Sequence, residues 1–136
     1  MAQPIIKSPI ILASAKYGPS ASALSFNQDF IVPDDAVGAV FMLNISAMSG
    51  TTPLLDLKFQ YVDQLSGNAS DVPGASIVQM SAAALRVITI DPRIAASANV
   101  AVLQPLGRVM RAVFTLDNTT TNSENYTFSL TARFSR

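Results

Sequence analysis

The sequence predicts an all-β protein, an antiparallel two-sheet sandwich of the jelly-roll or immunoglobulin-like type. Three observations carry this prediction. Apolar and polar residues alternate along several short runs, turn-forming residues separate these runs, and no segment has the period of a long helix. Alternation with a period of two is typical of a strand that buries one face and exposes the other. Both sandwich types stay open, because the pattern does not determine strand order.

The alternating runs define the expected strands, at residues 24–32, 37–48, 55–62, 76–80, 85–91, 109–116 and 126–134. The breaker at residues 49–53 lies between two of the longest runs, which are compatible with a hairpin. A polar turn at residues 117–124 precedes the final strand, and we expect the last two strands to form a hairpin. Residues 63–74 are dense in turn formers and predict an exposed loop. Residues 94–105 predict a loop, with a short helix as the alternative.

The run from Val37 to Val62 also predicts which side chains face the core. Its two strands bury one parity, and we expect that parity to place Phe41, Leu43, Leu57 and Phe59 in the interior. The opposite parity of the first strand is apolar too, and it carries Val40, Met42 and Met48. A second apolar face needs a cover, either from the same chain or from a neighbouring one.

The first 20 residues predict an extended arm, followed by a sandwich domain at residues 21–136. Three prolines, Pro4, Pro9 and Pro19, exclude a helix through this stretch. Between them lie apolar residues that favour a segment lying along a protein surface: Ile5, Ile6, Ile10, Ile11 and Leu12. Together with Val40, Met42 and Met48, these five residues form the predicted partner-binding set.

Composition points to contacts with other protein chains. The 136 residues are 49% hydrophobic and 13% charged, which is few charges for the surface of a monomer. No apolar run approaches the roughly 18–20 residues that span a bilayer, so no membrane contact is expected. Nine basic and nine acidic residues give a net charge of zero without a basic run, so no direct nucleic-acid binding is expected. A homo-oligomer is the expected state.

The residue types argue against catalysis. The chain has no histidine and no cysteine, which removes the commonest general base, the usual transition-metal ligand and the thiolate nucleophile. The oxygens at Asp63, Asn68, Ser70 and Asp71 lack the spacing of a calcium loop. We expect no enzyme activity, no catalytic residue, no metal and no cofactor. The N-terminus lacks the layout of a secretory signal, which predicts synthesis in a cytoplasm.

Two parts of the sequence form a recurring pattern of strand and turn residues. The first is Ser49-Gly50-Thr51-Thr52-Pro53-Leu54-Leu55-Asp56-Leu57-Lys58-Phe59-Gln60 with the later Asp71-Val72-Pro73-Gly74-Ala75. The second is Gly107-Arg108-Val109-Met110-Arg111-Ala112-Val113-Phe114-Thr115-Leu116 with Tyr126-Thr127-Phe128-Ser129-Leu130. In this order the segments resemble small virion structural proteins of tailed bacteriophages. The turn at residues 117–124 departs from the shorter turn of that group.

The resemblance implies a capsid decoration or cement protein. Such a protein would bind the major capsid protein on the exterior of the virion, with a trimer as the favoured oligomer, after synthesis in the host cytoplasm. An arm of this kind can add a strand to a partner's sheet through main-chain hydrogen bonds. Two alternatives stay open: a tail or baseplate component, and a carbohydrate-binding sandwich module.

Overall fold

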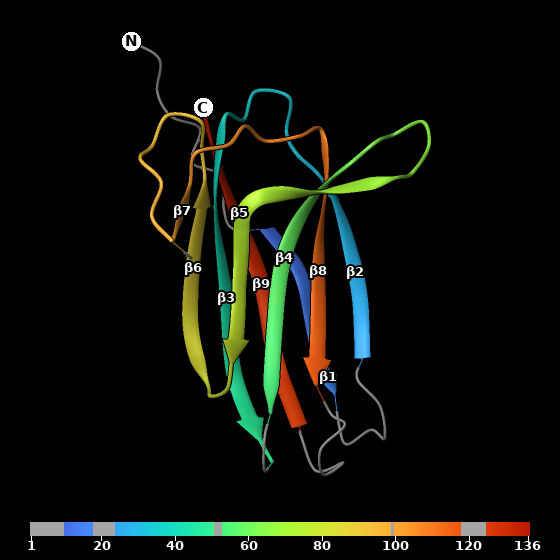
Figure 1. Cartoon of the computed structure of the whole chain (residues 1–136), viewed down its shortest axis with the longest axis vertical. Coiled ribbons are helices and arrows are strands. Elements are labelled where there is room, and N and C mark those ends of the chain that lie inside the picture. Colours follow the sequence, from blue (N-terminus) through green and yellow to red (C-terminus); the bar gives the residue numbers. More distant parts are fainter. Residues whose placement is uncertain (1–9, 18–23, 51–52, 99, 118–124) are drawn as a thin grey trace.

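The computed structural model describes residues 10–17, 24–50, 53–98, 100–117 and 125–136, and for residues 10–17, Leu24 and Asp117 it describes the backbone alone. Within these ranges the chain forms strands and no helix (Figure 1). The strands are β1 (Ile10–Tyr17), β2 (Leu24–Ile31), β3 (Gly38–Ser49), β4 (Leu54–Val62), β5 (Ala69–Met80), β6 (Ala84–Ile90), β7 (Ala101–Val102), β8 (Val109–Asp117) and β9 (Asn125–Ser135). The predicted all-β class is confirmed.

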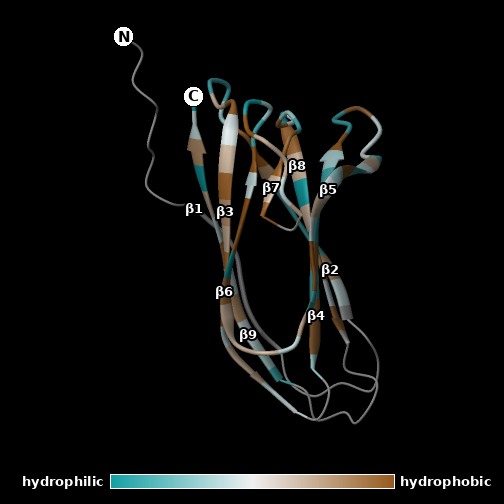
Figure 2. Cartoon of the chain, turned by 60° about the vertical axis from the view of Figure 1, so that its left-hand side comes forward, coloured by the Kyte–Doolittle hydropathy of each residue, from teal (hydrophilic) through white to brown (hydrophobic). Residues whose placement is uncertain are grey.

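The strands form two sheets that pack face to face. Sheet A has five strands in the order β1-β9-β3-β6-β7, and sheet B has four in the order β2-β8-β4-β5. All neighbours are antiparallel except the parallel pair β6 and β7. Figure 2 shows the sheets as two layers, with β3, β6 and β9 in one and β4, β5 and β8 in the other. This arrangement is the predicted two-sheet sandwich.

The strand order identifies the sandwich as a jelly roll. Apart from the two-residue β7, the first half of the chain pairs with the second half in a nested series: β1 with β9, β2 with β8, β3 with β6, and β4 with β5. This series is a long antiparallel ribbon. Pairing of β9 with β3 and of β8 with β4 rolls the ribbon into two sheets. The immunoglobulin-like alternative is therefore excluded.

The expected hairpin of the last two strands is wrong, and the hairpin that residues 49–53 left possible does not form either. The strands on either side of residues 49–53 lie in different sheets, β3 in sheet A and β4 in sheet B. The strands before and after residues 117–124 are divided in the same way, β8 in sheet B and β9 in sheet A. An alternating pattern shows that a strand buries one face, but it does not show whether the next strand lies beside it or opposite it.

Strands that are neighbours in sequence instead meet across the core. The rings of Phe41 on β3 and Phe59 on β4 have centroids 4.4 Å apart, and those of Phe114 on β8 and Phe128 on β9 are 5.0 Å apart. Contacts of this kind are typical of aromatic pairs in protein interiors. Phe41, Leu43, Leu57 and Phe59 are all buried, as predicted, with relative exposures of 0–1%.

Two loop predictions need correction. The expected loop at residues 63–74 ends at Asn68, because β5 begins at Ala69 and includes Pro73 and Gly74. Sheets tolerate proline and glycine at an edge, and β5 is an edge strand whose register with β4 shifts twice. The described part of residues 94–105 contains no helix but adds the short strand β7.

The predicted arm lies partly inside the sandwich. Its residues 10–17 form β1, which pairs with β9 from Ile10 opposite Ala132 to Tyr17 opposite Tyr126. The rest of the predicted arm, residues 1–9 and 18–20, lies outside the described residues. The described parts of the chain contain no helix that is long and apolar enough to span a membrane.

Candidate interaction surfaces

The outer surface of sheet A carries a patch of apolar side chains from two neighbouring strands. On β3, Val40 and Met42 point outward and are half-buried. On β6, Leu85 and Val87 point outward, with exposures of 60% and 39%. The register places Met42 opposite Val87, so the two strands form one continuous patch. We call this surface the sheet A face.

Few charges accompany this patch. Among the outward side chains of the described strands β9, β3 and β6, only Arg133 is charged. The remaining polar positions are small and neutral, such as Thr89 and Thr131. Depletion of charge at the centre of a surface is typical of protein–protein interfaces. The sheet A face is therefore better suited to contact with protein than to binding a charged ligand.

The outer surface of sheet B has the opposite character. One row of in-register residues crosses all four strands: Asp29, Arg111, Gln60 and Asp71. Arg111 donates to both carboxylate oxygens of Asp29, at 2.6 and 3.2 Å. Gln60 donates its amide Nε2–H to Asp71 at 2.7 Å, and Lys58 lies 3.2 Å from the same carboxylate. We call this surface the sheet B face.

These contacts alter the acidity of the two carboxylates. The hydrogen bonds from Arg111 hold the pKa of Asp29 below its ordinary value, and burial opposes them. The amide of Gln60 lowers the pKa of Asp71 most, followed by Lys58. Both groups stay ionised at neutral pH, so the sheet B face is charged and hydrated. The two outer faces thus differ sharply in polarity.

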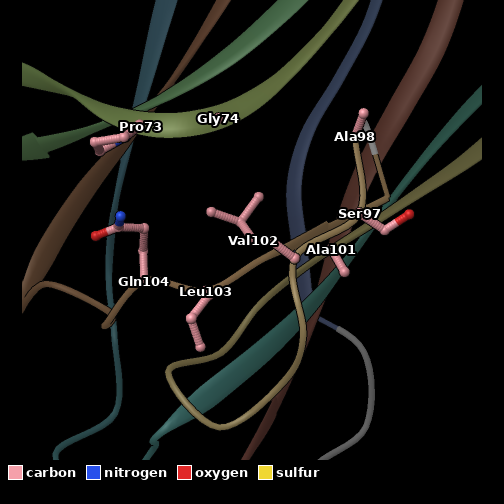
Figure 3. Close-up of a pocket in the computed structure, with 9 residues that line it drawn as sticks. Pro73, Gly74, Ser97, Ala98, Ala101, Val102, Leu103 and Gln104 are labelled. Carbon is pink, nitrogen blue, oxygen red and sulfur yellow. The ribbon is translucent and has the colours of Figure 1, made fainter.

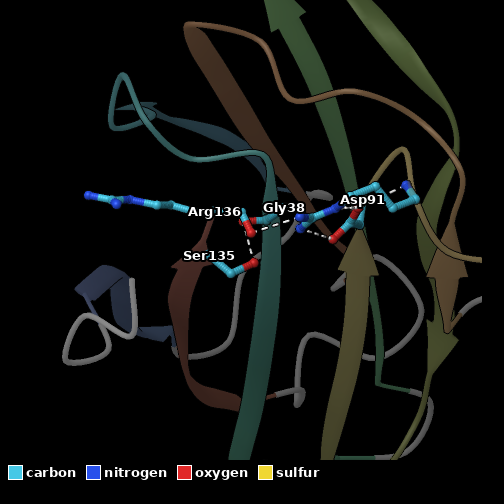
Figure 4. Close-up of polar contacts among 5 residues, drawn as sticks. Gly38, Asp91, Ser135 and Arg136 are labelled. Carbon is cyan, nitrogen blue, oxygen red and sulfur yellow. Dashed lines mark hydrogen bonds and ion pairs between the residues drawn. The ribbon is translucent and has the colours of Figure 1, made fainter. Parts of the chain in front are cut away.

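A buried carboxylate borders the sheet A face at its end near the C-terminus. Asp91 is 7% exposed, and Figure 4 shows it beside Gly38 and the C-terminal residues. Arg93 donates to this carboxylate from its backbone N–H at 2.8 Å and from its guanidinium at 2.8 and 2.9 Å. The guanidinium lowers the pKa of Asp91 and also donates to the Arg136 carbonyl at 2.7 Å. The cluster joins the segment after β6 to the end of the chain.

A pocket of about 260 Å³ lies between β5 and the segment that carries β7 (Figure 3). Pro73 and Gly74 form one wall, and Ser97, Leu103 and Gln104 lie on the other side. The described residues of its lining include no charged and no aromatic side chain. The pocket therefore offers neither an acid–base pair nor a stacking platform for a sugar ring.

Of the residues considered as calcium ligands, Asp63 serves its own loop, whereas Ser70 and Asp71 belong to β5. Asp63 accepts hydrogen bonds from the Ser66 hydroxyl at 2.7 Å and from the Leu65 backbone N–H at 3.2 Å. These bonds lower the pKa of Asp63 and stabilise a turn that ends at Gly67, where φ is 76°. Within the described ranges, no group of three or more acidic, histidine or cysteine side chains has the geometry to hold a metal ion.

The structure divides the predicted partner-binding residues into three groups. Val40 and Met42 lie on the sheet A face, whereas Met48 lies on the inner side and packs against the core. A register shift between Ile45 and Ala47 reverses the parity, so the prediction that the three side chains share a face is wrong for Met48. The other predicted residues have no described side chain: Ile10, Ile11 and Leu12 belong to β1 through their backbone, and Ile5 and Ile6 lie outside the described residues.

Sequence reasoning missed the contribution of β6 to this surface. Leu85 and Val87 complete the apolar patch, but only residues of β3 were predicted to lie on it. The signal was present, because the run Leu-Arg-Val-Ile-Thr-Ile at residues 85–90 is apolar on both parities. The pairing of β3 with β6, which joins the two apolar stripes, depends on the strand order.

The fold and these surfaces define a jelly-roll protein with one weakly charged and one strongly polar outer face. No protein-family model and no curated protein matches the chain. Among solved structures, the chain is similar to one in the structure of infectious bursal disease virus, Gx strain, with a TM-score of 0.51 and 10% identity. The likeness covers 98% of this chain and 31% of the viral one, so the chain spans about a third of that chain's length. The comparison supports the sandwich fold.

Proposed function

We propose that the protein is a non-enzymatic structural component of a virus particle. The observation that carries the proposal is the jelly-roll fold, whose likeness to a chain in a virus structure extends over 98% of the residues. Jelly rolls are common in viral capsids, and this step is an analogy between folds. The weakly charged sheet A face supports the proposal independently, because a particle component needs a surface that packs against other proteins.

Within this class, we favour a capsid decoration or cement protein on the outside of the shell. The support is the resemblance to small virion proteins of tailed bacteriophages, whereas the structural neighbour comes from a different virus. The major capsid protein would be the partner, with the sheet A face and residues 1–9 as the contact regions. The carbohydrate-binding alternative gains no support from the pocket near Pro73, which lacks an aromatic wall.

Two point variants test the proposed contact face. Met42→Lys places a charge in the centre of the sheet A face, and Val113→Lys places one on the sheet B face, where Val113 is also half-buried. Purified full-length proteins would be added to particles that lack the protein, and binding would be measured by co-sedimentation. We expect Met42→Lys to lose binding and Val113→Lys to keep it. Equal binding by both variants would exclude the sheet A face.

A deletion tests the contribution of the N-terminal segment. Removing residues 1–9 leaves every described strand in place, whereas removing residues 1–20 would also delete β1. We expect the shorter deletion to fold normally and to bind particles weakly. Copy number separates the remaining alternatives, because a decoration protein occurs in a fixed high ratio to the major capsid protein and a tail component occurs in few copies. Absence of the protein from purified particles would refute the virion role itself.

A further inference from the structure

The outer edge of β2 is the longest regular and open strand edge in the described structure. Figure 1 shows β2 as the outermost strand of sheet B, next to β8. Its eight residues keep one continuous register with β8, from Leu24 opposite Leu116 to Ile31 opposite Val109. The strand has no bulge and no proline. Open regular edges of this kind are templates for pairing with another strand.

The other edges carry features that hinder such pairing. β5 contains Pro73, two register shifts against β4, and positive φ angles of 77° at Gly74 and 55° at Gln79. β1 has a register shift between Ile11 and Ala13. β7 has two residues, and Ala101 exchanges backbone hydrogen bonds with Ser97 at 2.8 and 2.9 Å. β7 pairs only with Thr89 and Ile90, so the remaining edge of β6, residues 84–88, is open but shorter than that of β2. Irregular, short or covered edges are the usual protection against unwanted association.

The ladder shows which backbone groups point out from β2. Val32 donates its N–H to the Arg108 carbonyl at 2.9 Å, so even-numbered residues form the hydrogen-bonded pairs with β8. The N–H and C=O groups of the odd-numbered residues point toward the open edge: Ser25, Asn27, Asp29 and Ile31. The Gln28 side chain donates to the Asp29 carbonyl at 3.0 Å, which agrees with this direction.

We propose that a second copy of the chain pairs with this edge, β2 against β2, in an antiparallel two-fold contact. A two-fold axis beside Gln28 places Asn27 of one copy opposite Asp29 of the other, and it brings the outward-pointing backbone groups of all four odd-numbered residues into pairs between the copies. On the inner side, the half-buried Phe26 then lies opposite Phe30 of the second copy. The two four-stranded B sheets become one continuous sheet.

Charge supports this occupant and this register. Asp29 is the one charged residue of β2, and Arg111 of the same copy already neutralises it. The shifted register with Asp29 opposite Asp29 would place two carboxylates side by side, and the proposed register avoids this repulsion. A contact of this symmetry joins two copies, or it joins two larger assemblies to each other. The inference is independent of the proposed virion role.

Single cysteines test the register, since the chain has none of its own. In the proposed register two copies of residue 28 face each other at about 4.5 Å between Cα atoms, within disulfide range. Gln28→Cys should therefore form a covalent dimer under mild oxidation. The matched control Ser25→Cys should stay monomeric, because two copies of residue 25 would lie about 20 Å apart. Equal cross-linking of both variants would overturn the register.

Sedimentation equilibrium of the full chain tests the association itself. We expect a concentration-dependent dimer that Asn27→Asp weakens about tenfold, because an added carboxylate then faces Asp29 of the second copy. Asn27→Lys should strengthen the dimer by a similar factor, while Asn27→Ala should leave it largely unchanged. A monomer at every concentration, or equal effects of the Asp and Lys variants, would overturn the proposal. Circular dichroism of each variant confirms that the fold is intact.

Discussion

The carboxylate of Asp91 lies directly against the backbone of Gly38, at the point where β6 ends beside β3. A Cβ atom on Gly38 would stand 2.7 Å from the Asp91 Cγ, which is closer than such atoms approach in proteins. Gly38 does not have a positive φ, so glycine is required here for space and not for backbone conformation. The absence of a side chain leaves room for the carboxylate, which accepts three hydrogen bonds from Arg93.

Gly38→Ala should therefore lower the free energy of unfolding by about 1–3 kcal/mol, the usual range for an overpacked buried site. Urea denaturation measures the loss. In the Asp91→Ala background the same change should have a smaller effect, since the crowding group is gone. An equal loss in both backgrounds would show that the two residues do not interact.

A second prediction separates the two methionines that sequence parity placed on one face. Met48 follows the bulge in β3 and packs against the core, whereas Met42 precedes the bulge and lies on the sheet A face. Met48→Lys should lower the free energy of unfolding by about 2 kcal/mol, because it brings a charge to the core. Met42→Lys should change it by less than about 0.5 kcal/mol, since the ammonium reaches water. Similar losses for both variants would contradict the assigned faces.

This pair shows how far the sequence determines the structure. Alternation predicted the strands and the inward residues Phe41 and Phe59, because a period of two depends only on which side chains avoid water. The bulge after Ile45 has no composition signal, and one extra residue reverses every later side chain. The strand order also depends on long-range pairing, so the predicted hairpin of the last two strands was wrong. The residues that β3 contributes to the sheet A face were predicted. Those of β6 were missed, because the pairing of β3 with β6 also depends on the strand order.

A third prediction concerns a hydrogen bond that joins the two sheets. The backbone N–H of Leu54, at the start of β4, donates to the hydroxyl of Tyr126 on β9 at 3.0 Å, and Tyr126 is 1% exposed. Tyr126→Phe removes the acceptor and leaves a partly buried N–H without this partner. We expect a loss of about 1–2 kcal/mol in the free energy of unfolding.

Tyr61→Phe is the matched control for that measurement. The Tyr61 hydroxyl donates to the Pro105 carbonyl at 2.7 Å, but this bond is exposed and water can replace the lost donor. Its removal should lower the free energy of unfolding by no more than about 0.5 kcal/mol. If Tyr126→Phe and Tyr61→Phe lower the free energy of unfolding equally, the hydrogen bond between the sheets stabilises the fold no more than the exposed one does.

A fourth prediction concerns pH. Hydrogen bonds from Arg111 hold the pKa of Asp29 below its ordinary value, and those from Arg93 do the same for Asp91. A carboxylate whose pKa is lower in the folded state stabilises the fold at every pH above its unfolded pKa, about 3.9. That contribution is lost as the pH falls through the folded pKa, because the native state then has to bind the proton. Stability should therefore decrease on acidification below about pH 4.5.

Between pH 6 and 8 we expect the thermal midpoint to be nearly constant, because the chain has no histidine or cysteine side chain to titrate in this range. Thermal unfolding followed by circular dichroism at closely spaced pH values measures both parts of the curve. Asp91→Asn should be less stable than the parent at pH 7 and should show a shallower acid decrease, because residue 91 no longer changes charge. An acid decrease as steep as that of the parent would mean that other carboxylates cause it, and that the pairing of Asp91 with Arg93 contributes little.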